Sequence, residues 1–133
     1  MSDTLTLEDY LALVAKDRKP SKYHNRKTQA YGIWFDSQIE ANRYKSLKLM
    51  EAAVEICELE VQPGFLLLPG FKDKWGHRHR PVKYVGDFRY WSLKENHWVV
   101  EDTKGFETPV FKLKKKLFAR EYPDIELRIV RMS

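Results

Sequence analysis

Acidic residues and a lysine stand where two apolar segments of the sequence end or begin. Asp102 and Lys104 close the run that starts at Trp98, and Asp87 lies in the preceding apolar segment. Side chains two residues apart share one face of a strand, so Asp102 and Lys104 are expected to be neighbours. Adjacent carboxylates repel each other, and a hard divalent cation with oxygen ligands best explains a site that keeps both ionised. The spacing therefore predicts a Mg²⁺ site beside which Lys104 orients a water molecule or helps to deprotonate it.

The two apolar segments must pair for these acids to meet. Residues 84–91 and 97–105 each have the pattern of a strand, and the short polar connection between them predicts that they pair. Such a pair brings Asp87 and Asp102 together at one end of a sheet. Gly86 leaves room there for a close approach of the backbone. The alternative without a metal is that Asp87 forms an ordinary ion pair with Arg89, and Asp102 with Lys104.

A helix is expected to begin after Ser37, because Ser37 and Glu40 have the spacing of a capping box. Glu40 and Arg43 fall within the apolar arc of this helix, where polar groups need partners or a function. The apolar residues of the arc are Ile39, Tyr44, Leu47, Met50, Ala53 and Val54. Glu40 is therefore a candidate further ligand of the metal, directly or through water. The alternative is that Glu40 only caps the helix.

Other acids near this region receive less specific interpretations. Glu101 points to the face opposite Asp102, and we interpret it as a solvated or structural residue. Glu60 and Gln62 share one face of a strand and either approach the metal or form part of a polar sheet face.

The remaining segments complete an α/β pattern. Residues 30–36 and 125–131 alternate like strands, and residues 56–68 have the pattern of two strands separated by a turn. Residues 71–83 are basic and are expected to form an exposed loop or the tip of a hairpin. The order of helix, strands, helix and strand predicts a mostly antiparallel sheet with a final helical crossover, flanked by helices.

The second helix is expected to begin at Thr108 and Pro109 and to end after Tyr122, where Pro123 follows. Its apolar arc consists of Val110, Phe111, Leu113, Leu117 and Phe118. Lys114 lies near the middle of this arc. We expect its side chain to extend past the sheet edge to solvent, and the alternative is that it reaches the acids and holds a phosphate.

The length of 133 residues predicts one domain. We expect residues 1–29 to form a basic N-terminal extension with a short helix, and residues 30–133 to form the compact domain.

Basic residues are clustered rather than evenly spread, although the formal net charge is only +5. Residues 16–27 hold six Lys or Arg against one Asp, and residues 71–84 hold five against one. Clusters of this kind, mixed with aromatic residues, suit a nucleic acid whose phosphates are neutralised and whose bases stack. The candidate nucleic-acid-binding residues are Lys22, Tyr23, Arg26, Lys27, Lys74, Arg78, Arg80 and Lys114. An ordinary solvated surface remains the alternative explanation of the charge.

Several classes of protein do not fit the sequence. The single Cys57 excludes an internal disulfide and a zinc site made mainly of thiolates. No apolar run approaches the ~20 residues of a membrane span, and the N-terminus lacks the features of a signal peptide. A cytoplasmic protein is expected.

The order of these residues resembles that of the PD-(D/E)XK nuclease superfamily: a helix glutamate, then Asp87, then Asp102-Thr103-Lys104 at the end of the next strand. More closely, the chain resembles the phage-associated family DUF1064 through NRKTQAYGIWFDSQIEANRY, LEVQPGFLLLPGF, YVGDFRYW, VVEDTKG and the lysine-rich helix that follows. The resemblance extends from Asn25 to about Pro123. One departure is Gly86, where the superfamily most often has proline.

The resemblance implies a restriction-endonuclease-like αβββαβ core, with a mixed central sheet flanked by helices. It implies Mg²⁺- or Mn²⁺-dependent hydrolysis of DNA that leaves 5′-phosphate ends, in phage DNA recombination, repair or processing. Glu40, Asp87 and Asp102 would be the metal-associated acids and Lys104 the catalytic lysine. A junction- or flap-cleaving enzyme of this kind would favour a homodimer. The alternative is a nucleic-acid-binding protein that keeps the fold but cuts nothing.

Overall fold

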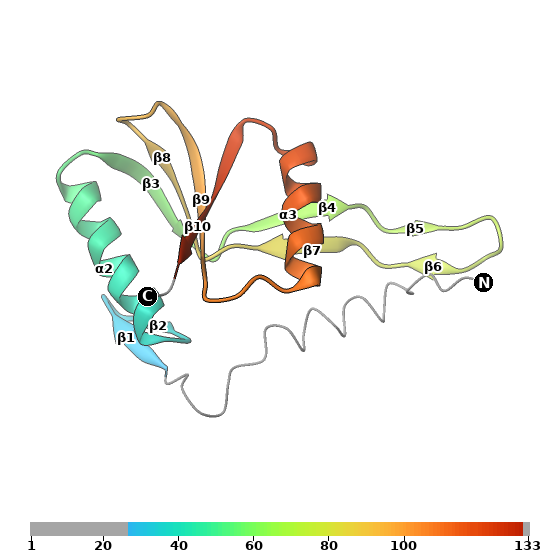
Figure 1. The fold of residues 1–133 in the computed structure, drawn as a ribbon, viewed down its shortest axis with the longest axis horizontal. Helices are drawn as coiled ribbons and strands as arrows, with labels where there is room; N and C mark the ends of the chain where they lie inside the picture. Colours follow the sequence, from blue (N-terminus) through green and yellow to red (C-terminus); the bar gives the residue numbers. More distant parts are fainter. Residues whose placement is uncertain (1–26, 132–133) are drawn as a thin grey trace.

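The computed structural model describes residues 27–131, which form a mixed α/β fold with two helices. Figure 1 shows the ribbon. The elements are β1 (Thr28–Ala30), β2 (Ile33–Phe35), α2 (Gln38–Ala52), β3 (Ile56–Val61), β4 (Gly64–Leu68), β5 (Phe71–Lys72), β6 (Arg78–His79), β7 (Val82–Val85), β8 (Phe88–Ser92), β9 (His97–Lys104), α3 (Pro109–Glu121) and β10 (Ile125–Arg131). Residues 1–26, including Lys22, Tyr23, Arg26 and most of the expected N-terminal extension, lie outside the described part.

A four-stranded mixed sheet forms the centre, in the order β10-β9-β8-β3. The pairs β3–β8 and β8–β9 are antiparallel, whereas β9 and β10 are parallel. Parallel neighbours need a crossover connection, and α3 supplies it between β9 and β10. The expected antiparallel strands and final helical crossover are confirmed.

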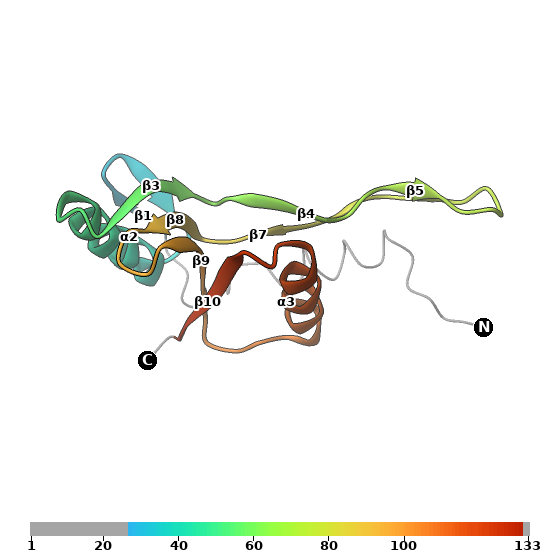
Figure 2. The ribbon, with the colours of Figure 1, turned by 90° about the horizontal axis from the view of Figure 1, so that it is seen from above.

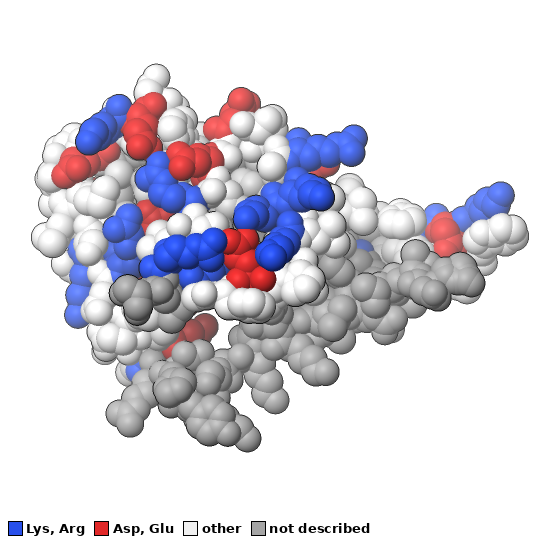
Figure 3. Space-filling model, in the orientation of Figure 1, with Lys and Arg blue, Asp and Glu red and all other residues white. Residues whose placement is uncertain are grey.

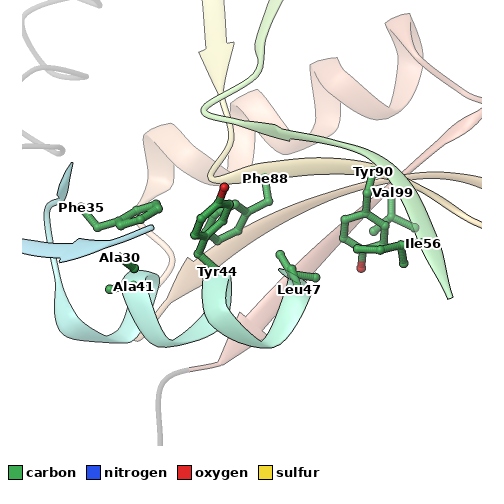
Figure 4. Packing of buried hydrophobic residues seen from close by; sticks show 9 residues of the cluster. All are labelled: Ala30, Phe35, Ala41, Tyr44, Leu47, Ile56, Phe88, Tyr90 and Val99. Carbon is green, nitrogen blue, oxygen red and sulfur yellow. The ribbon is translucent and has the colours of Figure 1, made fainter. Parts of the chain in front are cut away.

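The helix α2 covers one face of this sheet. Its buried residues Ala41, Tyr44 and Leu47 pack against Phe88 and Val99, among others (Figure 4). The rings of Tyr44 and Phe88 stack with centroids 5.9 Å apart. The expected arc of α2 is correct in part, since Ile39 is 37% exposed and Val54, after the helix ends, is 71% exposed.

A second core forms around α3 and the strands β4 and β7. Phe111 and Phe118 of α3 pack with Tyr84 and with Val100 of β9. Val99 and Val100 thus contribute to different cores. A strand with both faces covered needs a continuous apolar run, and this explains the sequence Trp98-Val99-Val100.

Both helix starts follow the sequence. The Ser37 hydroxyl accepts a hydrogen bond from the N–H of Glu40 at 3.1 Å. The Thr108 hydroxyl does the same for the N–H of Phe111, also at 3.1 Å, and Pro109 is the first residue of α3. In the described residues, neither helix is long and apolar enough to cross a membrane.

The single strand expected over residues 30–36 is wrong. The structure has a hairpin there, in which Ala30 pairs with Ile33. Tyr31 and Gly32 form its turn with φ of 53° and 78°. Two-residue hairpin turns of the type that matches strand twist need positive φ at both positions. The hairpin begins at Thr28, two residues before the expected start of the compact domain.

A long two-stranded arm extends away from the sheet (Figures 1 and 2). It consists of residues 64–85, in which β4 pairs with β7 and β5 pairs with β6. The expected hairpin tip over residues 71–83 is confirmed. The strand expected over residues 84–91 is instead divided at Gly86 and Asp87, where the chain passes from the arm into the sheet.

Candidate active site

The acids of β8 and β9 meet at one end of the central sheet. Phe88 is the register partner of Glu101, so the next step of the ladder sets Asp87 against Asp102. The backbone N–H of Asp87 donates to the Glu101 carbonyl at 2.9 Å. The Asp87 carboxylate in turn accepts the N–H of Thr103 at 2.7 Å. The strand pairing predicted from the sequence therefore does bring the two aspartates together.

Asp102 is buried, with 3% of its surface exposed. Its Oδ2 accepts a hydrogen bond from the Tyr84 hydroxyl at 2.5 Å. Its Oδ1 lies 3.8 Å from Nζ of Lys104. The same Nζ lies 4.5 Å from the centre of the Phe111 ring, which favours a cation. Lys104 is thus held beside the aspartates, as the two-residue spacing predicted.

Burial, together with the neighbouring charges of Asp102 and Glu40, raises the pKa of Asp87 to about 7. The Thr103 N–H and the Lys104 ammonium act against this rise but do not cancel it. The carboxylates of Asp102 and Glu40 therefore both lie within electrostatic reach of Asp87. Clustered carboxylate oxygens are the donors that a hard divalent cation such as Mg²⁺ prefers, so the residues present fit that ion.

Glu40 reaches this place from the first turn of α2. The cap of the helix uses its backbone N–H, and its carboxylate is close enough to raise the pKa of Asp87. The capping interpretation and the ligand interpretation are therefore compatible.

Gly86 permits the close approach that the sequence predicted. A Cβ atom at this position would lie 2.7 Å from Cγ1 of Val100. The N–H of Gly86 donates to the Pro63 carbonyl at 3.0 Å. A side chain at residue 86 would therefore displace the segment that carries Asp87.

Glu101 is fully buried, so its interpretation as a solvated residue is wrong and the structural interpretation is correct. Arg43 donates two hydrogen bonds of 2.7 Å to its carboxylate, and the Tyr90 hydroxyl donates a third. These contacts raise the pKa of Arg43. The sequence contained one signal of this network, because Arg43 lies in the core-facing arc of α2.

Lys114 is also buried, at 6% exposure, so the expectation that it extends to solvent is wrong. The neighbouring turns of its helix face carry Phe111 and Phe118. Both rings pack on Tyr84, with centroids 6.2 Å and 5.6 Å away. Residues three and four apart share a helix face, so Lys114 lies on the face that covers the tyrosine bonded to Asp102.

The remaining basic candidates among the described residues are not gathered at the acids. Lys74, Arg78 and Arg80 lie exposed on the arm, and Lys27 is exposed before β1. Glu60 pairs with Arg89, which removes Arg89 as the ordinary partner of Asp87. The backbone N–H of Gln62 donates to the Asp87 carbonyl at 2.8 Å.

A second acidic group lies at the opposite end of β9, around Glu95, His97 and Glu126, whose ligating atoms lie within 4.8 Å of one another. Arg128 donates to both glutamates, at 2.6 Å and 2.8 Å. The hydrogen bond from Arg128 to Glu126, with that of His97, lowers the pKa of Glu126 to about 2. A cation of the chain itself already balances this group.

Comparisons with known proteins complete the description. No significant match was found among curated proteins or among solved structures. Residues 20–133 match the family described as "Protein of unknown function (DUF1064)", and this covers most of the chain. The chain therefore belongs to the DUF1064 family.

Proposed function

We propose that this protein is a metal-dependent DNA endonuclease with a restriction-endonuclease-like core. The order α2, β3, β8, β9, α3 and β10 is consistent with the αβββαβ pattern of that fold. The observation that carries the proposal is the convergence of Asp87 and Asp102, with the raised pKa of Asp87, beside Lys104. Perturbed acids next to a positioned cation are typical of catalytic sites.

Glu40, Asp87 and Asp102 would hold Mg²⁺ or Mn²⁺. When bound, the ion would supply positive charge that balances the carboxylates and the charge developing on the phosphate. The protein contributes the positions of the oxygens. Tyr84 and the N–H of Thr103 each hold one carboxylate oxygen, which fixes the orientation of both aspartates.

Lys104 would orient the attacking water and stabilise the negative charge that develops as its proton leaves. The water oxygen bonds to phosphorus while the bond from phosphorus to the 3′ oxygen breaks. The water proton passes to solvent, and the 3′ oxygen gains a proton. The products are a 5′-phosphate and a 3′-hydroxyl. The ring of Phe111 and Asp102 keep the ammonium in place for this role.

The basic surface supports a nucleic-acid substrate. On the face in Figure 3, Lys and Arg side chains gather over the region of α3 and β10. Lys112, Lys116 and Arg120 are exposed on α3, and this helix follows the strand that ends at Lys104. A row of cations on the exposed face of α3 would hold a phosphate backbone by releasing its counterions. Lys114 is proposed to add charge next to Tyr84 from the buried face of α3. A homodimer would allow cuts in both strands.

The test is incubation of labelled duplex, single-stranded, flap and four-way DNA with Mg²⁺ and with Mn²⁺. We expect cleavage that requires the ion and leaves 5′-phosphates. Asp102→Ala should reduce the rate at least about 100-fold, since it removes an acid needed only in the reacting complex. Asp124→Ala is the matched control, because Asp124 is an exposed acid in the turn between α3 and β10.

Binding of DNA that persists in both variants, with no cleavage in either ion, would contradict the enzyme proposal. It would instead support a binding protein that retains the fold. Equal cleavage by Asp102→Ala and the unchanged protein would show that the acids are not the site.

A further inference from the structure

The arm is joined directly to the strand that carries Asp87. Its strand β7 leads through Gly86 into Asp87 and β8. The Gly86 N–H donates to Pro63 and the Gln62 N–H donates to Asp87, so both strands of the arm are fastened at this root. Pro63 is fully buried there. The position of the arm is thus tied to the position of the candidate site.

The tip of the arm is an ordered turn rather than an open loop. Oδ1 of Asp73 accepts the N–H groups of Trp75 and His77, both at 2.9 Å. Oδ2 of Asp73 lies 2.9 Å from Nε2 of His79. Gly76 has a φ of 90°, a conformation that other residues rarely adopt. Asp73 therefore fixes the turn with its own carboxylate, and it is the only acid among residues 71–84.

This turn presents Trp75 to solvent, with 76% of its surface exposed. Nζ of Lys74 lies 5.0 Å from the centre of the indole ring. Phe71 is 49% exposed and stacks on His79, with ring centroids 4.7 Å apart. In Figure 3 basic atoms lie next to a single acidic patch towards the far end of the arm. The tip thus presents exposed aromatic rings with cations beside them, and its one acid, Asp73, is used in the turn. Such a surface suits the bases and phosphates of a nucleic acid better than an apolar protein surface.

We propose that Trp75 stacks on an exposed base where a DNA duplex opens into a single strand, and that the substrate is therefore branched or frayed DNA. The inference rests on the proposed function and names its substrate class. A base inside a duplex has both faces covered, whereas a base at a junction offers one face to the indole. Lys72, Lys74 and Arg78 hold the phosphates on either side.

The length of the arm then determines where the cut falls. From Asp87 to Gly76 the chain takes eleven steps, which at about 3.3 Å each span about 36 Å. Successive phosphates of one duplex strand are about 3.4 Å apart along the axis. The arm therefore sets the distance between the cut and the junction, and its length limits this distance to roughly ten nucleotides.

The first experiment measures stacking without cleavage. Full-length protein carrying Asp102→Ala is titrated into DNA with 2-aminopurine at the first base pair of a duplex that ends in a single strand. We expect the fluorescence to be quenched on binding. Adding Trp75→Ala should remove the quench and weaken binding about 5- to 150-fold, and Trp75→Phe should keep most of both.

Trp34→Ala is the matched control, because Trp34 is also an exposed tryptophan, at 62%, but lies on β2. It should leave the quench unchanged. Equal quenching with and without Trp75 would overturn the inference. A change in oligomeric state with Trp75→Ala and no loss of quench would identify the arm as a protein interface, which also overturns it. These readouts do not depend on cleavage, so they are separate from the test of the proposed function.

The second experiment extends the arm. Duplicating Phe71–Lys72 in one strand and Arg78–His79 in the other lengthens each strand by two residues. Because the paired strands grow equally and by an even number, the alternation of side chains and the turn are kept. The tip moves outward by about 6.6 Å, so the cut should move about two nucleotides further from the junction. A cut that stays in place, with cleavage retained, would show that the arm does not measure this distance.

Discussion

An acidic group lies at each end of β9, and the pKa of an acid is lowered in one group and raised in the other. At one end, Glu95 and Glu126 are exposed, and Arg128 donates to both. At the other end Asp102 is buried beside Asp87, and the Lys104 ammonium lies 3.8 Å from its carboxylate. The pKa of Glu126 falls to about 2, whereas that of Asp87 rises to about 7. The comparison teaches that a cluster of acids is the better metal candidate where burial and neighbouring carboxylates raise a pKa than where hydrogen bonds from the chain's own cations lower it.

Neighbouring residues repeat this contrast on the two faces of one strand. Glu101 faces α2 and is balanced by Arg43, whereas Asp102 faces the core of α3 and receives a hydrogen bond from Tyr84. The strand alternation therefore separates a structural acid from a candidate ligand.

The largest effect on stability is expected from Arg43→Ala. It leaves Glu101 buried without its cation, and breaking a buried pair in this way costs about 3 kcal/mol. Arg128→Ala at the exposed end should cost less than about 1 kcal/mol. Urea unfolding of the two variants at pH 7 measures the difference. Equal losses would contradict the contrast between buried and exposed pairs.

The metal-free protein should respond to pH through Asp87. The folded pKa of about 7 lies above the value of 3.8 that an ordinary aspartate has, so the folded state binds more protons between these values. Stability therefore falls as the pH rises from about 4 towards 7. Asp87→Asn removes the charge, and in the presence of a chelator it should be more stable than the unchanged protein at pH 8 by on the order of 1–2 kcal/mol.

The difference should shrink as the pH falls from about 7 towards 4, and at about pH 3 it should nearly vanish, because Asp87 is then protonated in both the folded and the unfolded protein. Addition of Mg²⁺ at pH 8 should stabilise the unchanged protein and not Asp87→Asn. Thermal unfolding at both pH values gives the comparison. An asparagine variant that is less stable at both would show that the acids are balanced within the chain.

The smallest effect is expected from Glu126→Gln. Its folded pKa is depressed, so its stabilisation is present above about pH 4.5 and is lost as the pH falls towards 2. Glu126 is largely exposed, so the loss at pH 7 should be below about 1 kcal/mol and smaller still in high salt. Unfolding at pH 7 and pH 3 measures it. A loss that grows at low pH would reverse the expected sign.

Local patterns predicted the parts of the fold that depend on near neighbours. The caps at Ser37 and Thr108 follow from hydroxyls that reach the N–H groups three residues on. The pairing of β8 with β9 follows from a short connection between two apolar runs. The hairpin at Tyr31 and Gly32 was missed, because its strands are too short for alternation to be distinguished from a single strand.

Other features depended on residues far apart in the chain. Arg43 and Glu101 are separated by 58 positions, and neither residue type identifies the other as its partner. The burial of Lys114 requires Tyr84 and the arm strands to cover that face of α3, whereas helix periodicity shows only which residues share the face.

The sequence by itself determined which side chains share a face, since the two-residue period of a strand and the 3.6-residue period of a helix are properties of the backbone. It therefore predicted that Asp102 and Lys104 are neighbours and that Glu101 is not theirs. Only the tertiary structure decided which acids are buried together and which are paired with a distant cation, because burial and charge compensation arise between elements that come together on folding. The sequence also predicted the tip of the arm as an exposed loop or hairpin, but the tertiary structure decided that both strands of the arm are fastened beside Asp87.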